Sequence, residues 1–152
     1  MAPVLRDTLS AVAKAMQSAQ EPWWIIGSTA ATLHGATPID VADVDVLLSV
    51  PDAHRVLPTI GVEPARGEGS HLFRSEVFGT WRDNELPVEF MAGFHVCGAE
   101  GRWAPVALRT REGLTVEGAE VFVPGRKELL ELFRSFGRPK DLERVRLLQS
   151  LA

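Results

Sequence analysis

The stretch Trp23–Ser49, WWIIGSTAATLHGATPIDVADVDVLLS, carries the strongest structural signals of the chain. Its pattern predicts a buried strand at residues 23–26, a tight turn at 27–28 and a short helix at 28–34. A loop at 36–42 and a second strand at 43–50 are predicted to follow. Ser28 is predicted to be the N-cap of the helix, because its hydroxyl can accept a hydrogen bond from the first turn. The second strand places two aspartates in an apolar run, which is costly unless the carboxylates have a role.

The composition is typical of one soluble globular domain. The chain has 152 residues, of which 45% are hydrophobic and 24% charged, and its formal net charge is -4. We therefore expect a single domain over residues 1–152. An acidic chain is not expected to hold long nucleic acid through its phosphates, although a local basic patch could bind a small RNA.

Cysteine content and hydropathy exclude further classes. Cys97 is the single cysteine, so neither an intramolecular disulfide nor a cysteine-based zinc cluster can form. The N-terminus lacks the apolar core of a signal peptide, and no apolar run has the length of a membrane span. We expect a cytoplasmic protein with no membrane contact.

The remaining sequence predicts further helices and strands. Helices are expected at residues 3–20, 52–60, 126–136 and 140–151. Strands are expected at 71–82 and 86–92, with a strand pair or one bulged strand within 114–123. Segment 94–111 is predicted to be a loop or small hairpin. The order indicates an α/β (α+β) domain that ends in two helices.

Asp43 and Asp45 are expected on the same face of their strand, because side chains alternate along a strand. Two carboxylates about 6 to 7 Å apart repel each other unless a cation lies between them. Mg²⁺ suits such a position, since it prefers hard oxygen ligands. Two solvated acids on an edge strand are the alternative.

Glu89 is the candidate for a third carboxylate. In the predicted strand, Leu86, Val88 and Phe90 share one face and Glu89 points to the other. If this strand lies beside Asp43, three acids gather on one face. Three acids can hold two metal ions and leave one carboxylate as a base near an acceptor hydroxyl. The alternative is one exposed acid on a half-buried strand.

The turn at Gly27 and Ser28 predicts a phosphate-binding element. A glycine lets the backbone come close to a ligand, and the start of a helix offers unpaired N–H groups to phosphate. The Ser28 hydroxyl could add a further contact. A Gly-Ser turn alone is weak evidence, but the turn followed by the two acidic strands is a more specific combination.

This order of motifs resembles the nucleotidyltransferase superfamily, in which a hydrophobic strand, Gly-Gly or Gly-Ser and a helix precede an Asp-x-Asp strand and a third acid. The closest resemblance is to small bacterial AbiEii-type toxins and minimal nucleotidyltransferases, whose C-terminal helices carry a segment similar to GRPKDL at residues 137–142. The resemblance covers residues 23–50, 86–91 and 125–148. It implies a mixed sheet flanked by helices.

The resemblance also implies a role for each motif residue. Gly27 and Ser28 would contact the triphosphate of an NTP, and Lys140 would neutralise phosphate. The three carboxylates would be catalytic and would bind two Mg²⁺ ions. The implied reaction is in-line attack of an acceptor hydroxyl on the α-phosphorus, with release of pyrophosphate.

Two positions differ from the family pattern. The loop at 37–42 has no cation where related sequences often have an arginine, and Phe133 stands where they often have a lysine. Arg74 or Arg82 could replace the missing charge, and Arg74 is our further candidate for nucleotide binding. The differences leave open a catalytically impaired nucleotide-binding or regulatory module, including a toxin–antitoxin component with a protein partner.

The C-terminal helices are locally basic in an acidic chain. Their basic side chains are Arg126, Lys127, Arg134, Arg138, Lys140, Arg144 and Arg146. They are either solvated helix faces or a cationic wall opposite the carboxylates, suited to a triphosphate or an RNA end. The sequence does not identify the acceptor, which could be RNA, a protein or a small molecule.

Overall fold

The computed structural model describes residues 1–151 and contains a mixed five-stranded sheet. The strands are β1 (Trp24–Ile26), β2 (Val44–Leu48), β3 (Phe73–Trp81), β4 (Val88–Cys97) and β5 (Trp103–Pro105). Their order is β1-β2-β4-β3, and β5 also pairs with β4. β2 and β4 run parallel and the other neighbours antiparallel. The predicted fold class is confirmed.

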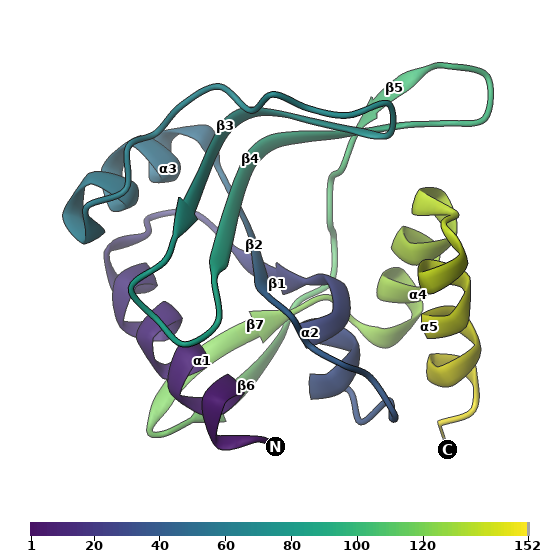
Figure 1. The fold of residues 1–152 in the computed structure, drawn as a ribbon, viewed down its shortest axis with the longest axis horizontal. Coiled ribbons are helices and arrows are strands. Elements are labelled where there is room, and N and C mark those ends of the chain that lie inside the picture. Colours follow the sequence, from purple (N-terminus) through teal and green to yellow (C-terminus); the bar gives the residue numbers. More distant parts are fainter. Residues whose placement is uncertain (152) are drawn as a thin grey trace.

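Helices surround this sheet (Figure 1). They are α1 (Pro3–Ala15), η1 (Met16–Ser18), α2 (Gly27–Leu33), α3 (Val50–Val56), η2 (Leu57–Ile60), α4 (Arg126–Phe136) and α5 (Pro139–Gln149). In Figure 1, α1 and α3 lie to the left of the central strands, and α4 and α5 stand together on the right. The last two helices therefore form a separate wall beside the sheet.

A hairpin forms a second, two-stranded sheet. It consists of β6 (Glu112–Val116) and β7 (Ala119–Val123). Glu117 and Gly118, which connect them, both have positive φ, at 51° and 77°. Two consecutive residues with positive φ form the turn that best matches the twist of paired strands. The strand pair is thus correct and the single bulged strand is not.

One local prediction was confirmed and another was wrong. β4 continues through Phe94 to Cys97 and pairs antiparallel with β5, so segment 94–111 contains the small hairpin that was one of its two predicted forms. The extended part of β4 also pairs with β3, through Ser75↔Phe94, Arg74↔His95 and Phe73↔Val96. Helix α2 begins at Gly27, with Ile26 as its N-cap, so Ser28 is not the cap. The turn is made by Gly27, whose φ is +69°.

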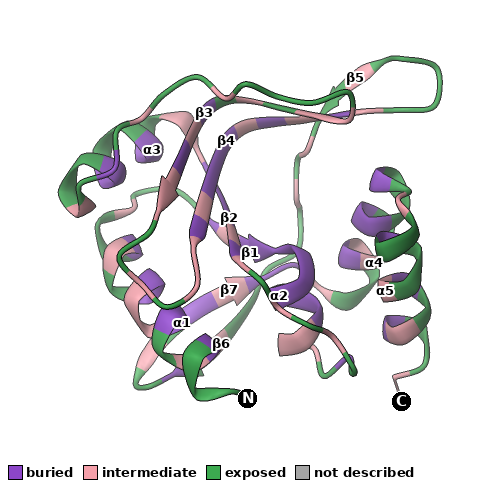
Figure 2. Cartoon of the chain, viewed as in Figure 1, coloured by how far each residue is buried: buried purple, intermediate pink, exposed green. Residues whose placement is uncertain are grey.

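The core surrounds β2 and β4, most of whose apolar side chains are buried. Val46 and Phe90 are register partners and both have 0% exposure. On the helical wall, the buried face of α4 is formed by Leu129, Leu132, Phe133 and Phe136. In Figure 2, the ribbon of α4 is coloured as buried on the side toward the sheet. Within residues 1–151, no helix combines the length and the apolar character needed to cross a membrane.

Candidate active site

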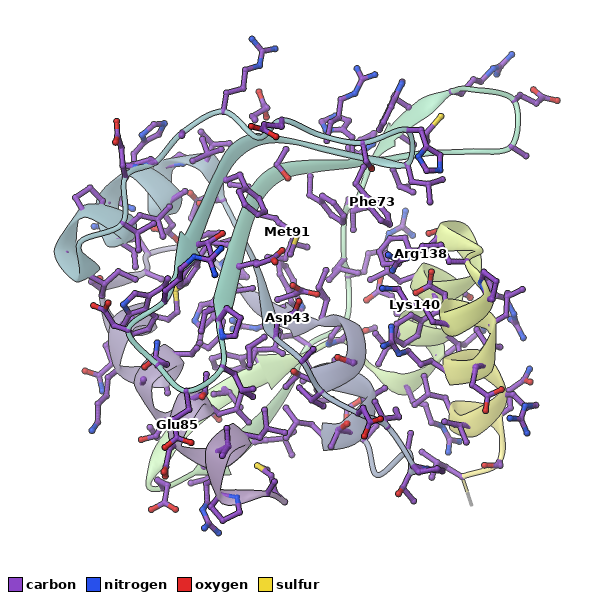
Figure 3. The ribbon with its side chains drawn as sticks, viewed as in Figure 1. Asp43, Phe73, Glu85, Met91, Arg138 and Lys140 are labelled. Carbon is purple, nitrogen blue, oxygen red and sulfur yellow. The ribbon has the colours of Figure 1, made fainter. Side chains whose placement is uncertain are left out.

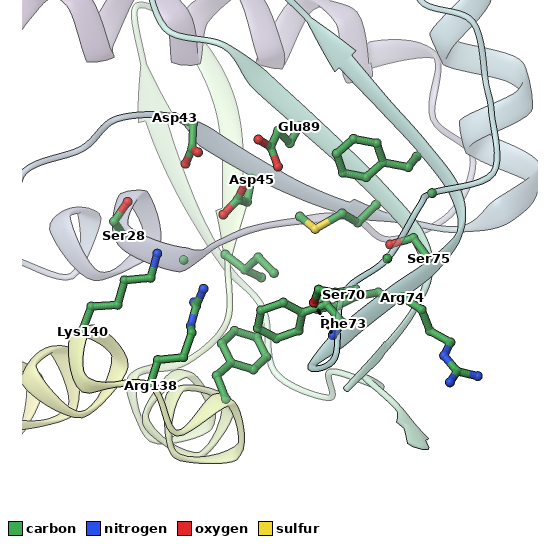
Figure 4. A pocket seen from close by; sticks show the side chains of 18 of the residues that line it. Ser28, Asp43, Asp45, Ser70, Phe73, Arg74, Ser75, Glu89, Arg138 and Lys140 are labelled. Carbon is green, nitrogen blue, oxygen red and sulfur yellow. Dashed lines mark hydrogen bonds between the residues drawn. The ribbon is translucent and has the colours of Figure 1, made fainter. Parts of the chain in front are cut away.

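Three carboxylates meet on one face of the central strands. Asp45 on β2 and Glu89 on β4 are partners in the parallel register, and Asp43 directly precedes β2. One oxygen from each of Asp43, Asp45 and Glu89 lies within 4.8 Å of the others (Figure 4). Strand alternation alone would place only the two aspartates together. The parallel pairing of β2 and β4 brings the third acid to them.

Backbone contacts fix the acidic strand. The Thr29 hydroxyl of α2 donates to the Asp43 carbonyl at 3.1 Å, and Thr29 is fully buried. The Val44 amide donates to the Pro87 carbonyl at 3.0 Å, immediately before β4 begins. The entry of β2 is therefore held by both the helix and the neighbouring strand, which limits movement of the acids.

Gly27 provides the space for Asp45. Ile26 at the end of β1 is the register partner of Asp45, so the turn into α2 passes directly beside the carboxylate. A Cβ atom on Gly27 would lie 2.8 Å from the Asp45 Oδ2 atom. Positive φ and this close approach both require glycine. Ser28, at 7% exposure, follows in the wall of the same cavity.

The electrostatics of the acids favour a bound cation. Burial raises the pKa of Asp45 to about 7, with further increases from Asp43 and Glu89 that Arg138 and Arg144 partly oppose. Burial and Asp43 also raise the pKa of Glu89, against a lowering by Arg82. Clustered carboxylate oxygens are hard ligands of the kind Mg²⁺ takes. The donor set therefore fits a magnesium site.

A cavity of about 400 Å³ separates the acids from a cationic wall. Arg138, Lys140 and Arg144, at the start of α5 and within it, line the opposite side. Figure 3 shows Arg138 and Lys140 directed from the helical wall toward Asp43, while Glu85 lies far from the cavity. In Figure 4, Lys140 reaches toward Ser28 and Arg138 toward Asp45.

Comparisons with known proteins agree with this architecture at the level of the fold. No family model and no curated protein matches the sequence. A Thermotoga maritima protein with a provisional nucleotidyltransferase assignment superposes with a TM-score of 0.71 at 19% identity, over 92% of this chain and 89% of that one. The chain has the nucleotidyltransferase fold.

Two proteins solved with an antibiotic or an adenylylated antibiotic show the same fold at lower identity. The lincosamide antibiotic adenylyltransferase LnuA, with lincomycin bound, has a TM-score of 0.62 at 10% identity, covering 96% of this chain and 97% of its own. ANT(2'')-Ia, in complex with adenylyl-2''-tobramycin, has a TM-score of 0.58 at 12% identity, covering 94% and 86%. The nucleotidyltransferase fold thus extends over almost the whole chain, whereas the resemblance to AbiEii-type toxins stays a prediction.

Part of the cavity lining is aromatic. Its apolar residues include Phe73, Phe78, Met91, Phe94, Phe133 and Phe136. The rings of Phe73 and Phe136 meet nearly edge to face, with centroids 4.9 Å apart. Such a surface favours a flat or apolar group over a charged one. In this chain, Phe133 therefore contributes to an apolar wall.

Arg74 lies at the edge of the cavity. Its guanidinium carbon is 3.5 Å from the centroid of the Trp103 ring, which places it in cation–π contact with β5. Figure 4 shows the side chain pointing away from the three acids. A role for Arg74 in nucleotide binding stays a prediction.

Arg138 and Arg144 are the site residues whose individual roles were not predicted. They were grouped only with the other basic residues of the C-terminal helices. A signal was nevertheless present in the spacing: Asp141 lies three residues after Arg138 and three before Arg144. An acid between two arginines at helical spacing indicates that all three side chains meet on one side of the helix.

Proposed function

We propose that this chain is a metal-dependent nucleotidyltransferase, which moves an NMP from an NTP to an acceptor hydroxyl. The main observation that supports this function is the cavity, in which three carboxylates on the sheet face three cations on α5. A triphosphate with bound metal ions needs both kinds of charge within one site. The nucleotidyltransferase fold supports the proposal.

Asp43, Asp45 and Glu89 would hold the metal, with two Mg²⁺ ions as the family resemblance implies. Bound Mg²⁺ would offset negative charge on the reacting phosphates. The chain contributes the fixed donor oxygens and the open space at Gly27 beside Asp45. The raised pKa of Asp45 makes this cation site dependent on pH.

Gly27, Ser28 and Lys140 would bind the triphosphate. Gly27 and Ser28 line the cavity at the turn into α2, next to the acids. Lys140 is exposed, lines the same cavity and points toward Ser28 (Figure 4). An ammonium group and backbone N–H groups are both suitable partners for phosphate oxygens. Arg74 is the candidate for a more distant contact.

In the proposed reaction, the acceptor hydroxyl oxygen bonds to the α-phosphorus while the bond from that phosphorus to pyrophosphate breaks. Glu89 is the proposed base that takes the hydroxyl proton. Its raised pKa makes it a better proton acceptor than an ordinary glutamate. It is also less enclosed than Asp45, which leaves room for an acceptor.

Label transfer tests the proposal. The protein would be incubated with Mg²⁺ and each NTP labelled at the α-phosphate, together with small RNA, protein or aminoglycoside and lincosamide acceptors. The small molecules are included because LnuA and ANT(2'')-Ia, which have the same fold, carry lincomycin and adenylyl-2''-tobramycin. Label on any acceptor, lost in the Asp43→Asn, Asp45→Asn double variant, supports the enzyme. No transfer to any acceptor class contradicts it.

A catalytically impaired nucleotide-binding or regulatory module is the second candidate. It is favoured by the absence of a cation in the loop at 37–42 and by Phe133 at the position where a lysine was expected. Such a module would bind an NTP with Mg²⁺ without transferring it. A cytoplasmic toxin–antitoxin component with a protein partner is one form of this proposal, and copurification from the native host tests it.

A further inference from the structure

Asp141 is a fully buried acid behind the cationic wall. It lies in the first turn of α5 with 0% exposure. Its Oδ2 atom accepts a hydrogen bond from Arg138 Nε at 2.6 Å, and its Oδ1 atom accepts one from Arg138 Nη2 at 3.0 Å. Arg144 Nη1 lies 3.7 Å from Oδ1. One buried carboxylate thus contacts both guanidinium groups that line the cavity.

The paired contact fixes the orientation of Arg138. Because Nε and Nη2 donate to Asp141, Nη1 lies at the edge of the planar guanidinium that does not face this carboxylate. The plane also contacts two aromatic rings, with Cζ 5.0 Å from the Phe73 centroid and 5.9 Å from that of Phe136. Figure 4 shows the side chain extending toward Asp45.

Arg144 is restrained in a similar way. Its side chain is 17% exposed and its Cζ lies 5.8 Å from the centroid of the Phe133 ring. Both arginines lower the pKa of Asp45, so their charges act at the acidic face of the cavity. The arginines therefore stand between the buried Asp141 and the space where phosphates would lie.

Helix capping explains only part of this arrangement. Asp141 does accept from the Arg138 backbone amide at 3.2 Å, which satisfies the amide of the N-cap residue at the start of α5. A cap needs one side-chain acceptor and no charge. It does not account for the paired contact with the Arg138 side chain or for the nearby Arg144. Burial of a charge is costly unless the partners are held in place.

We propose that Asp141 is a positioning residue that holds Arg138 and Arg144 as a clamp for the terminal phosphates of the NTP. The proposal rests on the proposed function, because it assumes that a triphosphate occupies the cavity. Asp141 itself does not touch the substrate. Without its charge, both guanidiniums become free to rotate, and the fixed donors for phosphate are lost.

Asp141→Asn separates positioning from capping. The asparagine keeps the size of the side chain and one oxygen acceptor for the cap, but removes the charge that pairs with two arginines. Isothermal titration with ATP, ADP, AMP and inorganic tripolyphosphate, each with Mg²⁺, gives the readout. We expect a loss of roughly 10- to 50-fold in affinity for ATP and tripolyphosphate, and less than about 2-fold for AMP.

Glu143→Gln is the matched control. Glu143 pairs with Arg146 on the exposed side of α5, so the variant removes the same kind of charge from the same helix away from the cavity. It should bind all four ligands as the unchanged chain does. Arg138→Lys keeps the positive charge but loses the paired contact with Asp141, and it should show the same loss of affinity for ATP. This variant tests the proposal if Asp141→Asn does not fold.

The outcomes are distinguishable. Equal weakening of AMP, ADP and ATP binding in Asp141→Asn would show a general structural defect and overturn the positioning role. Unchanged tripolyphosphate binding in Asp141→Asn and Arg138→Lys would overturn it as well. If the unchanged chain binds neither ATP nor tripolyphosphate, the proposed function itself fails. A loss of affinity for ATP and tripolyphosphate that AMP does not share supports the clamp.

Discussion

Asp45 and Glu89 are direct partners across the parallel pair β2–β4, although α3 and β3 lie between them in the sequence. The pairing places a carboxylate from each strand on the face toward the cavity, beside Asp43. Parallel neighbours need a long connection, which here contains α3 and the outer strand β3. The acidic site therefore depends on the topology of the sheet as well as on a local motif.

The double variant Asp43→Asn, Asp45→Asn should lose nucleotidyl transfer while remaining folded. We expect a fall of at least about 100-fold in the transfer rate, because two of the three metal-binding carboxylates become neutral. Initial rates with α-labelled NTP measure it. Asp83→Asn, in the exposed turn before β4 and outside the cavity lining, is the control and should retain full activity. Equal activity of the double variant and the control would contradict the assignment of the acids.

Asp45 should destabilise the metal-free fold at neutral and higher pH. Its pKa rises from 3.8 to about 7 on folding, so the folded chain holds a proton that the unfolded chain has released. The contribution of Asp45 to the free energy of unfolding therefore falls as the pH rises from about 4 to about 7. Above pH 7 this contribution no longer changes.

Asp45→Asn removes this penalty. We expect the variant to be more stable than the unchanged chain by roughly 1–2 kcal/mol at pH 8, with little difference at pH 4. Urea unfolding at the two pH values measures the difference. Mg²⁺ should stabilise the unchanged chain more at pH 8 than at pH 5.5, since protons compete for Asp45 below its pKa. If Asp45→Asn increases the free energy of unfolding equally at pH 4 and pH 8, the result contradicts a raised pKa of Asp45.

Gly27→Ala should disturb the acids through a direct contact. The new Cβ would lie 2.8 Å from Asp45 Oδ2, and φ is +69°. Gly35→Ala is a closely matched control, because Gly35 also has positive φ, +98°, but no atom lies within 4 Å of the built Cβ. Each substitution should cost roughly 1–2 kcal/mol in stability from the backbone alone.

Only Gly27→Ala should also weaken the Mg²⁺-dependent rise in melting temperature. The reason is that Asp45 must move away from the new methyl group and from the other two ligands. Differential scanning fluorimetry with and without Mg²⁺ measures both variants. If Gly35→Ala loses the Mg²⁺ response to the same extent, backbone strain alone explains the effect.

Lys140→Gln should weaken NTP binding without a loss of stability. Lys140 is exposed and lines the cavity, so removal of its charge leaves the core intact. A drop of roughly 10-fold in ATP affinity is expected from the loss of one charge-assisted contact to phosphate. Lys127→Gln on α4, exposed and outside the cavity lining, should bind ATP normally. An equal effect of the two variants would indicate general electrostatics.

The acidic half of the site could be predicted from sequence because it depends on short-range rules. Alternation along a strand places Asp43 and Asp45 on one face, and an isolated acid in an apolar strand singles out Glu89. That the Glu89 strand lies beside the Asp43–Asp45 strand was only a condition of the prediction, and the parallel pairing of β2 and β4 meets it. None of these steps required knowledge of side-chain contacts between distant elements.

The cationic half was less predictable. The orientation of Arg138 depends on the burial of Asp141 and on two phenylalanines from different elements, Phe73 on β3 and Phe136 on α4. The chain also reverses at Gly137, with φ of +70°, which directs α5 back along α4. Such contacts between distant parts of the chain are not visible in a local pattern. The sequence therefore left open whether the basic residues of the C-terminal helices face solvent or the carboxylates, and the structure places Arg138, Lys140 and Arg144 in the cavity lining.

The division of charge between sheet and helical wall has a consequence for biosynthesis. A chain emerges from the ribosome N-terminus first, and its early segments fold before its last ones. The acids at 43, 45 and 89 are therefore synthesised well before the arginines of α5. Until α5 docks, the three carboxylates lack the cations that line the opposite side of the cavity in the folded chain. Under the proposed function, competence to bind a triphosphate would be acquired only when α5 is in place.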